Sequence, residues 1–139
     1  MSAIRDLRAK LLAIGGKRVI AQPEPHTALL LSKGKVFPRR GRKRLRREPF
    51  LCHRHACLLY AEHHARGRKG RLRIVRGYGL WGEAWYQHSW LWDGRRVVET
   101  NLTPDLYFGA VLNDDEALRF VFSQVMGALP GWEAVRNAA

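Results

Sequence analysis

Three residues in the chain have side chains suited to nucleophilic catalysis, at positions 52, 88 and 99. Cys52 lies where a helix is expected to begin, and the first turn of a helix favours the reactive thiolate through its dipole and unpaired N–H groups. The positive charges of Arg46 and Arg47, just before it, act in the same direction. Cys52 is therefore the candidate nucleophile, and its backbone amide is a candidate oxyanion-hole donor.

The candidate base and its partner belong to a predicted β-hairpin. Residues 85–100 have the pattern of two strands joined by Asp93-Gly94, a strong hairpin signal. A two-residue turn would place His88 directly opposite Glu99, with Cβ atoms about 5 Å apart. A carboxylate beside an imidazole orients the ring and stabilises its protonated form. Together with the candidate nucleophile, these residues predict a Cys-His-Glu triad.

Hydrophobic periodicity predicts the elements that would position these side chains. We expect an amphipathic helix over residues 2–14 and a buried strand or extended segment at 28–31. A central helix is expected from about 50 to 65, with the candidate nucleophile in its first turn. Residues 71–78 alternate as a strand, and the glycine-rich residues 77–82 are expected to connect it to the hairpin. Three antiparallel strands would thus form a meander after the central helix.

The C-terminal part is expected to add a loop and a final helix. Residues 101–111 are expected to form a loop, and Asn113 and Glu116 have the spacing of a capping box for a helix over 114–128. The stripe expected to be buried on that helix consists of Leu118, Val121, Phe122, Val125, Met126 and Leu129. The predicted fold is a single α+β domain spanning 1–139, in which an antiparallel meander packs on the central helix between N- and C-terminal helices.

Positive charge is high and unevenly distributed. The chain has a net charge of +13, and residues 1–98 contain 23 Lys and Arg against 6 Asp and Glu. A basic loop is expected at about 38–48, and such runs remain solvated unless an acidic partner binds. Phosphate backbones are the commonest partners of this kind. The candidate polyanion-binding residues are Arg39, Arg40, Arg42, Lys43, Arg44, Arg46, Arg47, Arg68, Lys69 and Arg71.

Simple burial is the main alternative for Cys52, and a zinc site is a further alternative for the cysteines and histidines of the central helix. Cys52 and Cys57 lie about 140° apart around a helix, and no second Cys/His pair has finger or ribbon spacing. Cys57 is therefore expected in the core, and neither a metal nor a cofactor is predicted. Ordinary cross-strand charge pairing is the alternative explanation for His88 opposite Glu99.

The order of these motifs resembles the papain-like and transglutaminase-like superfamily, most closely its small single-domain bacterial and phage members. The resemblance covers about residues 50–110. Two positions differ from the usual pattern, because His55 replaces an asparagine and Glu99 replaces an aspartate or asparagine. The resemblance implies Cys52 as nucleophile, His88 as base and Glu99 as orienting acid. The matching pieces are Leu51-Cys52-His53-Arg54-His55-Ala56, Gly77-Tyr78, His88-Ser89-Trp90, Asp93-Gly94, Val97-Val98-Glu99-Thr100 and Tyr107-Phe108-Gly109.

Two functional hypotheses follow from the sequence. The first is a cysteine hydrolase or acyltransferase acting on a peptide or amide substrate, for which an acidic protein is one candidate. The second is a binding protein that uses the basic loop on nucleic acid or an acidic protein surface. A basic loop that steers an acidic substrate would combine both. With two cysteines, no membrane span and no apolar signal core in Met1–Asp6, a cytoplasmic location is expected.

Overall fold

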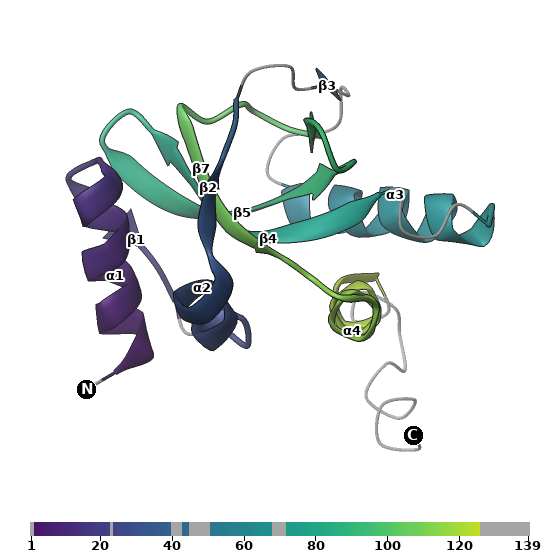
Figure 1. Cartoon of the computed structure of the whole chain (residues 1–139), viewed down its shortest axis with the longest axis horizontal. Coiled ribbons are helices and arrows are strands. Elements are labelled where there is room, and N and C mark those ends of the chain that lie inside the picture. Colours follow the sequence, from purple (N-terminus) through teal and green to yellow (C-terminus); the bar gives the residue numbers. More distant parts are fainter. Residues whose placement is uncertain (1, 23, 40–42, 45–50, 68–71, 126–139) are drawn as a thin grey trace.

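The chain folds into a mixed α+β architecture in which helices pack on one sheet (Figure 1). The computed structural model describes residues 2–22, 24–39, 43–44, 51–67 and 72–125. Within these ranges no helix has both the length and the apolar character needed to cross a membrane. The α+β class expected from the sequence is confirmed.

A single seven-stranded sheet forms the centre of the fold. Along the sheet the strands follow the order β2-β7-β4-β5-β6-β3, and β1 pairs with β5. The neighbours β4, β5 and β6 are antiparallel, which confirms the predicted meander, whereas β1–β5 and β3–β6 are parallel. The strands are β1 (Arg18–Ile20), β2 (Lys35–Phe37), β3 (Lys43–Arg44), β4 (Arg73–Trp81), β5 (Ala84–Trp92), β6 (Val97–Glu99) and β7 (Leu106–Val111).

Four helices are described, and they pack in two pairs against the sheet. Helices α1 (Ala3–Ile14) and α2 (Thr27–Lys33) bury a cluster that includes Trp85 of β5. Helices α3 (Cys52–Ala65) and α4 (Asp114–Val125) bury a second cluster around Leu91 of the same strand. Figure 1 shows the two pairs toward opposite ends of the sheet. The expected N-terminal, central and C-terminal helices are therefore present.

Two predictions for segments of the first two thirds of the chain are wrong. Residues 28–31 belong to helix α2 and not to a strand, because a short apolar run fits either element and packing against α1 decides. The glycine-rich residues 77–82 are mostly strand β4 and not a connection. Glycine is needed there because a Cβ on Gly77 would lie 2.0 Å from the Phe108 carbonyl oxygen of the neighbouring strand.

The C-terminal prediction is correct for the helix and wrong for the loop. Residues 106–111 form strand β7 between β2 and β4, which places Tyr107 inside the sheet. The capping box is confirmed by two reciprocal hydrogen bonds between Asn113 and Glu116, of 2.8 and 2.9 Å. The predicted buried stripe is partly wrong, because Leu118 is 55% exposed and Phe122 40% exposed. Ala117 and Phe120 are buried instead, and Val121 is partly buried. The Val125 side chain, Met126 and Leu129 lie outside the described part of the chain, so the predictions for them are untested.

The hairpin has a longer turn than predicted. Val97 pairs with Trp92 and Val98 with Leu91, so four residues, 93–96, form the turn. The Asp93 carboxylate causes this, because its Oδ1 accepts hydrogen bonds from the backbone N–H groups of Arg95 and Arg96. The prediction that His88 lies directly opposite Glu99 is therefore wrong by two positions. A shift of two residues leaves both side chains on the same face of the sheet.

Part of the predicted basic loop is a strand. Lys43 and Arg44 form β3 and pair in parallel with Val98 and Glu99 of β6. The segment that follows it leads to Cys52 at the start of α3.

Candidate active site

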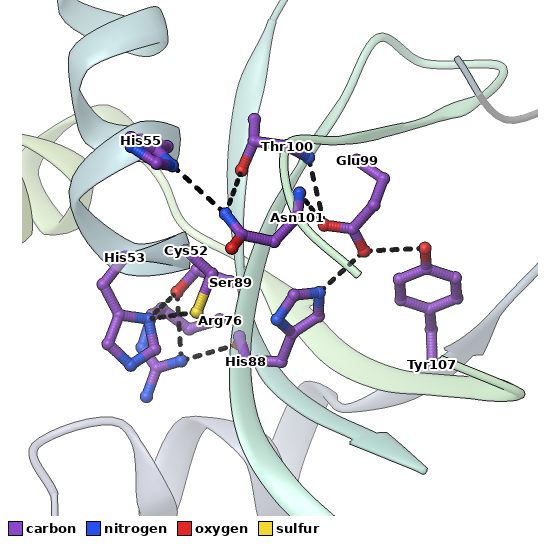
Figure 2. Close-up of polar contacts among 10 residues, drawn as sticks. All are labelled: Cys52, His53, His55, Arg76, His88, Ser89, Glu99, Thr100, Asn101 and Tyr107. Carbon is purple, nitrogen blue, oxygen red and sulfur yellow. Dashed lines mark hydrogen bonds and ion pairs between the residues drawn. The ribbon is translucent and has the colours of Figure 1, made fainter. Parts of the chain in front are cut away.

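The start of helix α3 lies at an interrupted edge of strand β5. On this edge β1 pairs with Ala84–Tyr86, and β6 pairs with Leu91 and Trp92. Strand β4 pairs with residues 87–90 of β5 on the other edge, but on this edge none of the described strands pairs with them. Cys52 and His53 approach the strand there, beside residues 88 and 89 (Figure 2). Because successive strand residues point to opposite faces, groups at this edge can contact side chains from both faces of the sheet.

On one face His88 is held by Glu99. The Nε2 atom of His88 lies 2.7 Å from Oε1 of Glu99, and the two side chains are only 2% and 0% exposed. The same carboxylate oxygen accepts a hydrogen bond of 2.8 Å from Tyr107, and its other oxygen accepts from the N–H groups of Thr100 and Asn101. These contacts fix the carboxylate, and the carboxylate fixes the imidazole. The other ring nitrogen of His88 faces Cys52 (Figure 2).

The thiol and the imidazole each change the acidity of the other. Burial alone would raise the pKa of Cys52, but hydrogen bonding to His53 and His88 and their positive charge lower it from 9.0 to about 5. Burial alone would lower the pKa of His88, but its hydrogen bonds with Cys52 and Glu99 and their negative charges raise it from 6.5 to about 9. Between these two values the thiolate and the imidazolium are present together.

On the opposite face His53 contacts the same thiol. Its Nδ1 lies 3.7 Å from Sγ of Cys52 and 2.5 Å from Oγ of Ser89. Arg76 donates hydrogen bonds to Oγ of Ser89 and to the backbone carbonyl of His88. Figure 2 shows this group beside α3, with Glu99 and Tyr107 on the other side of β5.

Backbone donors at the start of α3 are available beside the thiol. The first intrahelical bond runs from the N–H of His55 to the carbonyl of Leu51, at 2.9 Å. The N–H groups at 52, 53 and 54 precede it and have no acceptor within the helix. Leu51 occupies the N-cap and provides no side-chain hydrogen bond. The end of the helix therefore presents donors that a substrate oxygen could use.

A pocket of about 620 Å³ opens beside the thiol. Its walls are mostly apolar, and Trp81, Tyr86 and Leu102 are among the residues that line it. The rings of Trp81 and His88 pack in a T-shaped contact, with 5.1 Å between ring centroids. The residues that line the pocket are Cys52, His53, Trp81, Tyr86, Gln87, His88, Asn101 and Leu102.

Asn101 links the loop after β6 to helix α3. Its Nδ2 lies 3.1 Å from Nδ1 of His55, and its backbone N–H bonds Glu99. His55 lies one turn of α3 after Cys52 and therefore helps to hold Asn101, which lines the same pocket as the thiol.

Comparison with protein-family models, with curated proteins and with solved structures gives no match. The chemical interpretation of the site depends on its own geometry.

The predicted triad residues lie together, whereas the second cysteine lies apart from them. Cys57 is fully buried in the core under α3, and burial raises its pKa to about 12. Within the described ranges no group of three His, Cys, Asp or Glu side chains could hold a metal ion. His63 and His64 lie in the last turn of α3, about three turns from Cys52.

Little of the predicted polyanion surface falls within the described residues. Arg39 is exposed at the end of β2, and Lys43 and Arg44 are placed by their backbone in β3. The others lie outside the described part of the chain: Arg40, Arg42, Arg46, Arg47, Arg68, Lys69 and Arg71.

Four residues of the site were missed in the sequence. His53 falls among the histidines of the central helix for which zinc binding is the alternative, and Tyr107 falls within the loop predicted over 101–111. Arg76 has a visible signal, because it lies among the apolar residues of a strand, and such a buried polar residue needs a partner. Ser89 has a weaker signal, because it follows Gln87 and His88 in its strand. The alternation of Tyr107 with Gly109 and Val111 was the signal for strand β7.

Proposed function

We propose that this chain is a small cysteine hydrolase or acyltransferase of the papain-like or transglutaminase-like type, acting on an amide or peptide-like bond. The observation that carries the proposal is the position of Cys52, at an uncapped helix start and facing an imidazole that is held by a buried carboxylate. An ordinary surface charge pair would not explain why His88 and Glu99 are buried together with Tyr107.

Each group has a role in acyl transfer. The Cys52 thiolate attacks the substrate carbonyl carbon, a C–S bond forms, and the carbonyl π electrons move to oxygen, where the N–H groups of α3 stabilise the charge. Collapse of this intermediate breaks the C–N bond, and the leaving nitrogen takes the proton of His88. Water then attacks the thioester and gives a proton to His88, and the C–S bond breaks. An amine in place of water gives acyl transfer instead of hydrolysis.

Two adjoining pockets support a substrate with different groups on the two sides of the scissile bond. The pocket beside the thiol is mostly apolar. A second pocket of about 560 Å³ shares His53 and Gln87 with the first and is lined by the charged residues Glu116 and Arg119. A substrate spanning both would place an apolar group near Trp81 and a polar group near α4.

Thiol labelling tests the proposal without a known substrate. In a Cys57→Ala background, iodoacetamide should label Cys52 with half-maximal rate near pH 5, because the thiolate is the reacting form. The His88→Ala variant should shift this midpoint upward, toward the ordinary value of about 8.5. A Cys52→Ala chain, in which only the buried Cys57 remains, is the control and should stay unlabelled. A midpoint near 8.5 in the chain that retains His88 would refute the proposal.

The basic segment supports a second proposal, that this protein binds an acidic partner. Arg44 of β3 pairs with Glu99 of β6, so the described residues of this segment, Lys43 and Arg44, lie beside the candidate triad. Positive charge near a reaction site raises the rate of encounter with acidic substrates or nucleic acid. Replacing Arg39, Arg40 and Arg42 with Gln should weaken binding of an acidic peptide or an oligonucleotide and flatten its salt dependence. Unchanged binding at low salt would exclude this segment as the binding surface, whatever the outcome of the labelling experiment.

A further inference from the structure

A second chain of polar contacts reaches Cys52 from the face of the sheet opposite His88. His53 bonds Ser89, and Ser89 accepts a hydrogen bond of 3.1 Å from Arg76. Arg76 in turn donates to Glu24 at 2.7 Å, and Gln87 donates to the same carboxylate. The two chains of contacts meet at the thiol.

This second chain is costly to bury. The side chains of Arg76 and Glu24 are 4% and 8% exposed, and Ser89 is fully buried. Removing an ion pair from water can cost more free energy than its attraction returns, so a buried pair such as this one is weak evidence of a stabilising role. At the other end of this chain of contacts, the imidazole of His53 lies against the thiol of Cys52, and such a pair is suited to proton transfer.

The geometry of strand β5 produces both chains. His88 and Ser89 are adjacent and must point to opposite faces of the sheet. The helix start lies at the interrupted edge of this strand, so Cys52 can meet His88 from one face while its neighbour His53 meets Ser89 on the other. Arg76 also donates a hydrogen bond to the backbone carbonyl of His88, which helps to fix strand β5 at this point.

We propose that His53 is a second catalytic base at Cys52, aligned by Ser89. Arg76 and Glu24 are positioning residues behind Ser89. This inference rests on the proposed function of Cys52 as the nucleophile. It assigns a role to a residue that directly follows the nucleophile in sequence and that lies outside the predicted triad.

The second base gives the thiol proton two possible acceptors. When the S–H bond breaks, an N–H bond forms on either His53 or His88, and no oxidation or reduction is involved. An Nδ1–H on His53 can donate to the thiolate and to Ser89, because the Ser89 oxygen has two lone pairs and Arg76 uses one. The thiolate therefore keeps a hydrogen-bond donor after His88 has given its proton to the leaving group.

The test compares the pH midpoint of Cys52 labelling among variants in the Cys57→Ala background. His53→Gln retains hydrogen-bonding atoms but does not titrate, and Ser89→Ala removes the alignment while leaving the imidazole. His64→Gln, on the same helix and outside the site, is the matched control. We expect both site variants to raise the midpoint by about one unit, so that labelling at pH 5 falls about fivefold while the rate at pH 9 is retained.

The outcomes separate this inference from the proposed function. A raised midpoint in His53→Gln and Ser89→Ala, with native circular dichroism and an unchanged His64→Gln control, supports the second base. If both variants keep the parent midpoint while His88→Ala raises it, the second base is refuted and the Cys52–His88 function stands. If the parent itself titrates near 8.5, the proposed function fails, and the second base fails with it.

Discussion

His88 and Glu99 form a 2.7 Å contact across two strands although they are not directly opposed. The pairing of Leu91 with Val98, when continued, places Trp90 opposite Glu99 and leaves His88 one diagonal step away. Diagonal neighbours are about 7–8 Å apart, within reach of long side chains. A glutamate spans this diagonal, whereas an aspartate is one methylene shorter. The register therefore accounts for glutamate at this position.

This geometry predicts the effects of two substitutions at position 99. Glu99→Gln keeps the length and removes the charge that raises the pKa of His88, whereas Glu99→Asp keeps the charge and shortens the reach. Both should lower kcat/KM on a cleavable amide by roughly 10²- to 10⁴-fold, the range typical of acid–base catalysis. Tyr107→Phe, which removes only one hydrogen bond to the carboxylate, is the milder comparison. Full activity in Glu99→Gln would contradict the role of this carboxylate.

The pH dependence of turnover should be bell-shaped. Below about pH 5 the Cys52 thiol gains a proton and ceases to be nucleophilic, so the rate falls on the acid side. Above about pH 9 His88 loses the proton that the leaving group needs, so the rate falls on the alkaline side. In Glu99→Gln the alkaline limb should move to lower pH, because the pKa of His88 falls. A steady rise in rate through pH 10 would argue against His88 as the acid.

The capping box of α4 should contribute to stability and leave the thiol unaffected. Asn113→Ala removes the acceptor for the N–H of Glu116 and should lower the free energy of unfolding in urea by about 1 kcal/mol. Leu118→Ala, on the exposed face of the same helix, should change it by less than about 0.5 kcal/mol. The labelling midpoint of Cys52 should remain the same in both variants. If the free energy of unfolding of Asn113→Ala equals that of the parent, tertiary packing alone holds the start of α4.

Acid should destabilise the fold partly through His26. Burial, with the nearby charge of Arg76, lowers the pKa of His26 from 6.5 to about 4, and the ring packs edge-on against Phe120. A group whose pKa is lower in the folded state contributes stability that is complete above 6.5 and is lost as the pH falls through about 4. His26→Gln should therefore lose less stability than the parent between pH 7 and pH 4 in urea titrations. Equal losses in both proteins would show that His26 is not responsible.

Local sequence patterns were sufficient for several elements and for the face of the triad. The capping residues Asn113 and Glu116 define the start of α4, and Asp93-Gly94 marks the hairpin. The register was predicted incorrectly, because the Asp93 side chain closes a longer turn. The prediction that His88 and Glu99 share a face is still correct, because the error is two residues and every second side chain of a strand points to the same face.

Sequence alone determined that Cys52 begins a helix and that His88 and Glu99 share a face, because helix starts and strand alternation depend on near neighbours. Only the tertiary structure decided that β1 and β6 leave a gap along β5, into which the start of α3 fits. That gap brings His53 and Ser89 to the same thiol from the other face. Such contacts depend on the order of strands in the sheet, and strand order is set by packing among distant segments that no local pattern encodes.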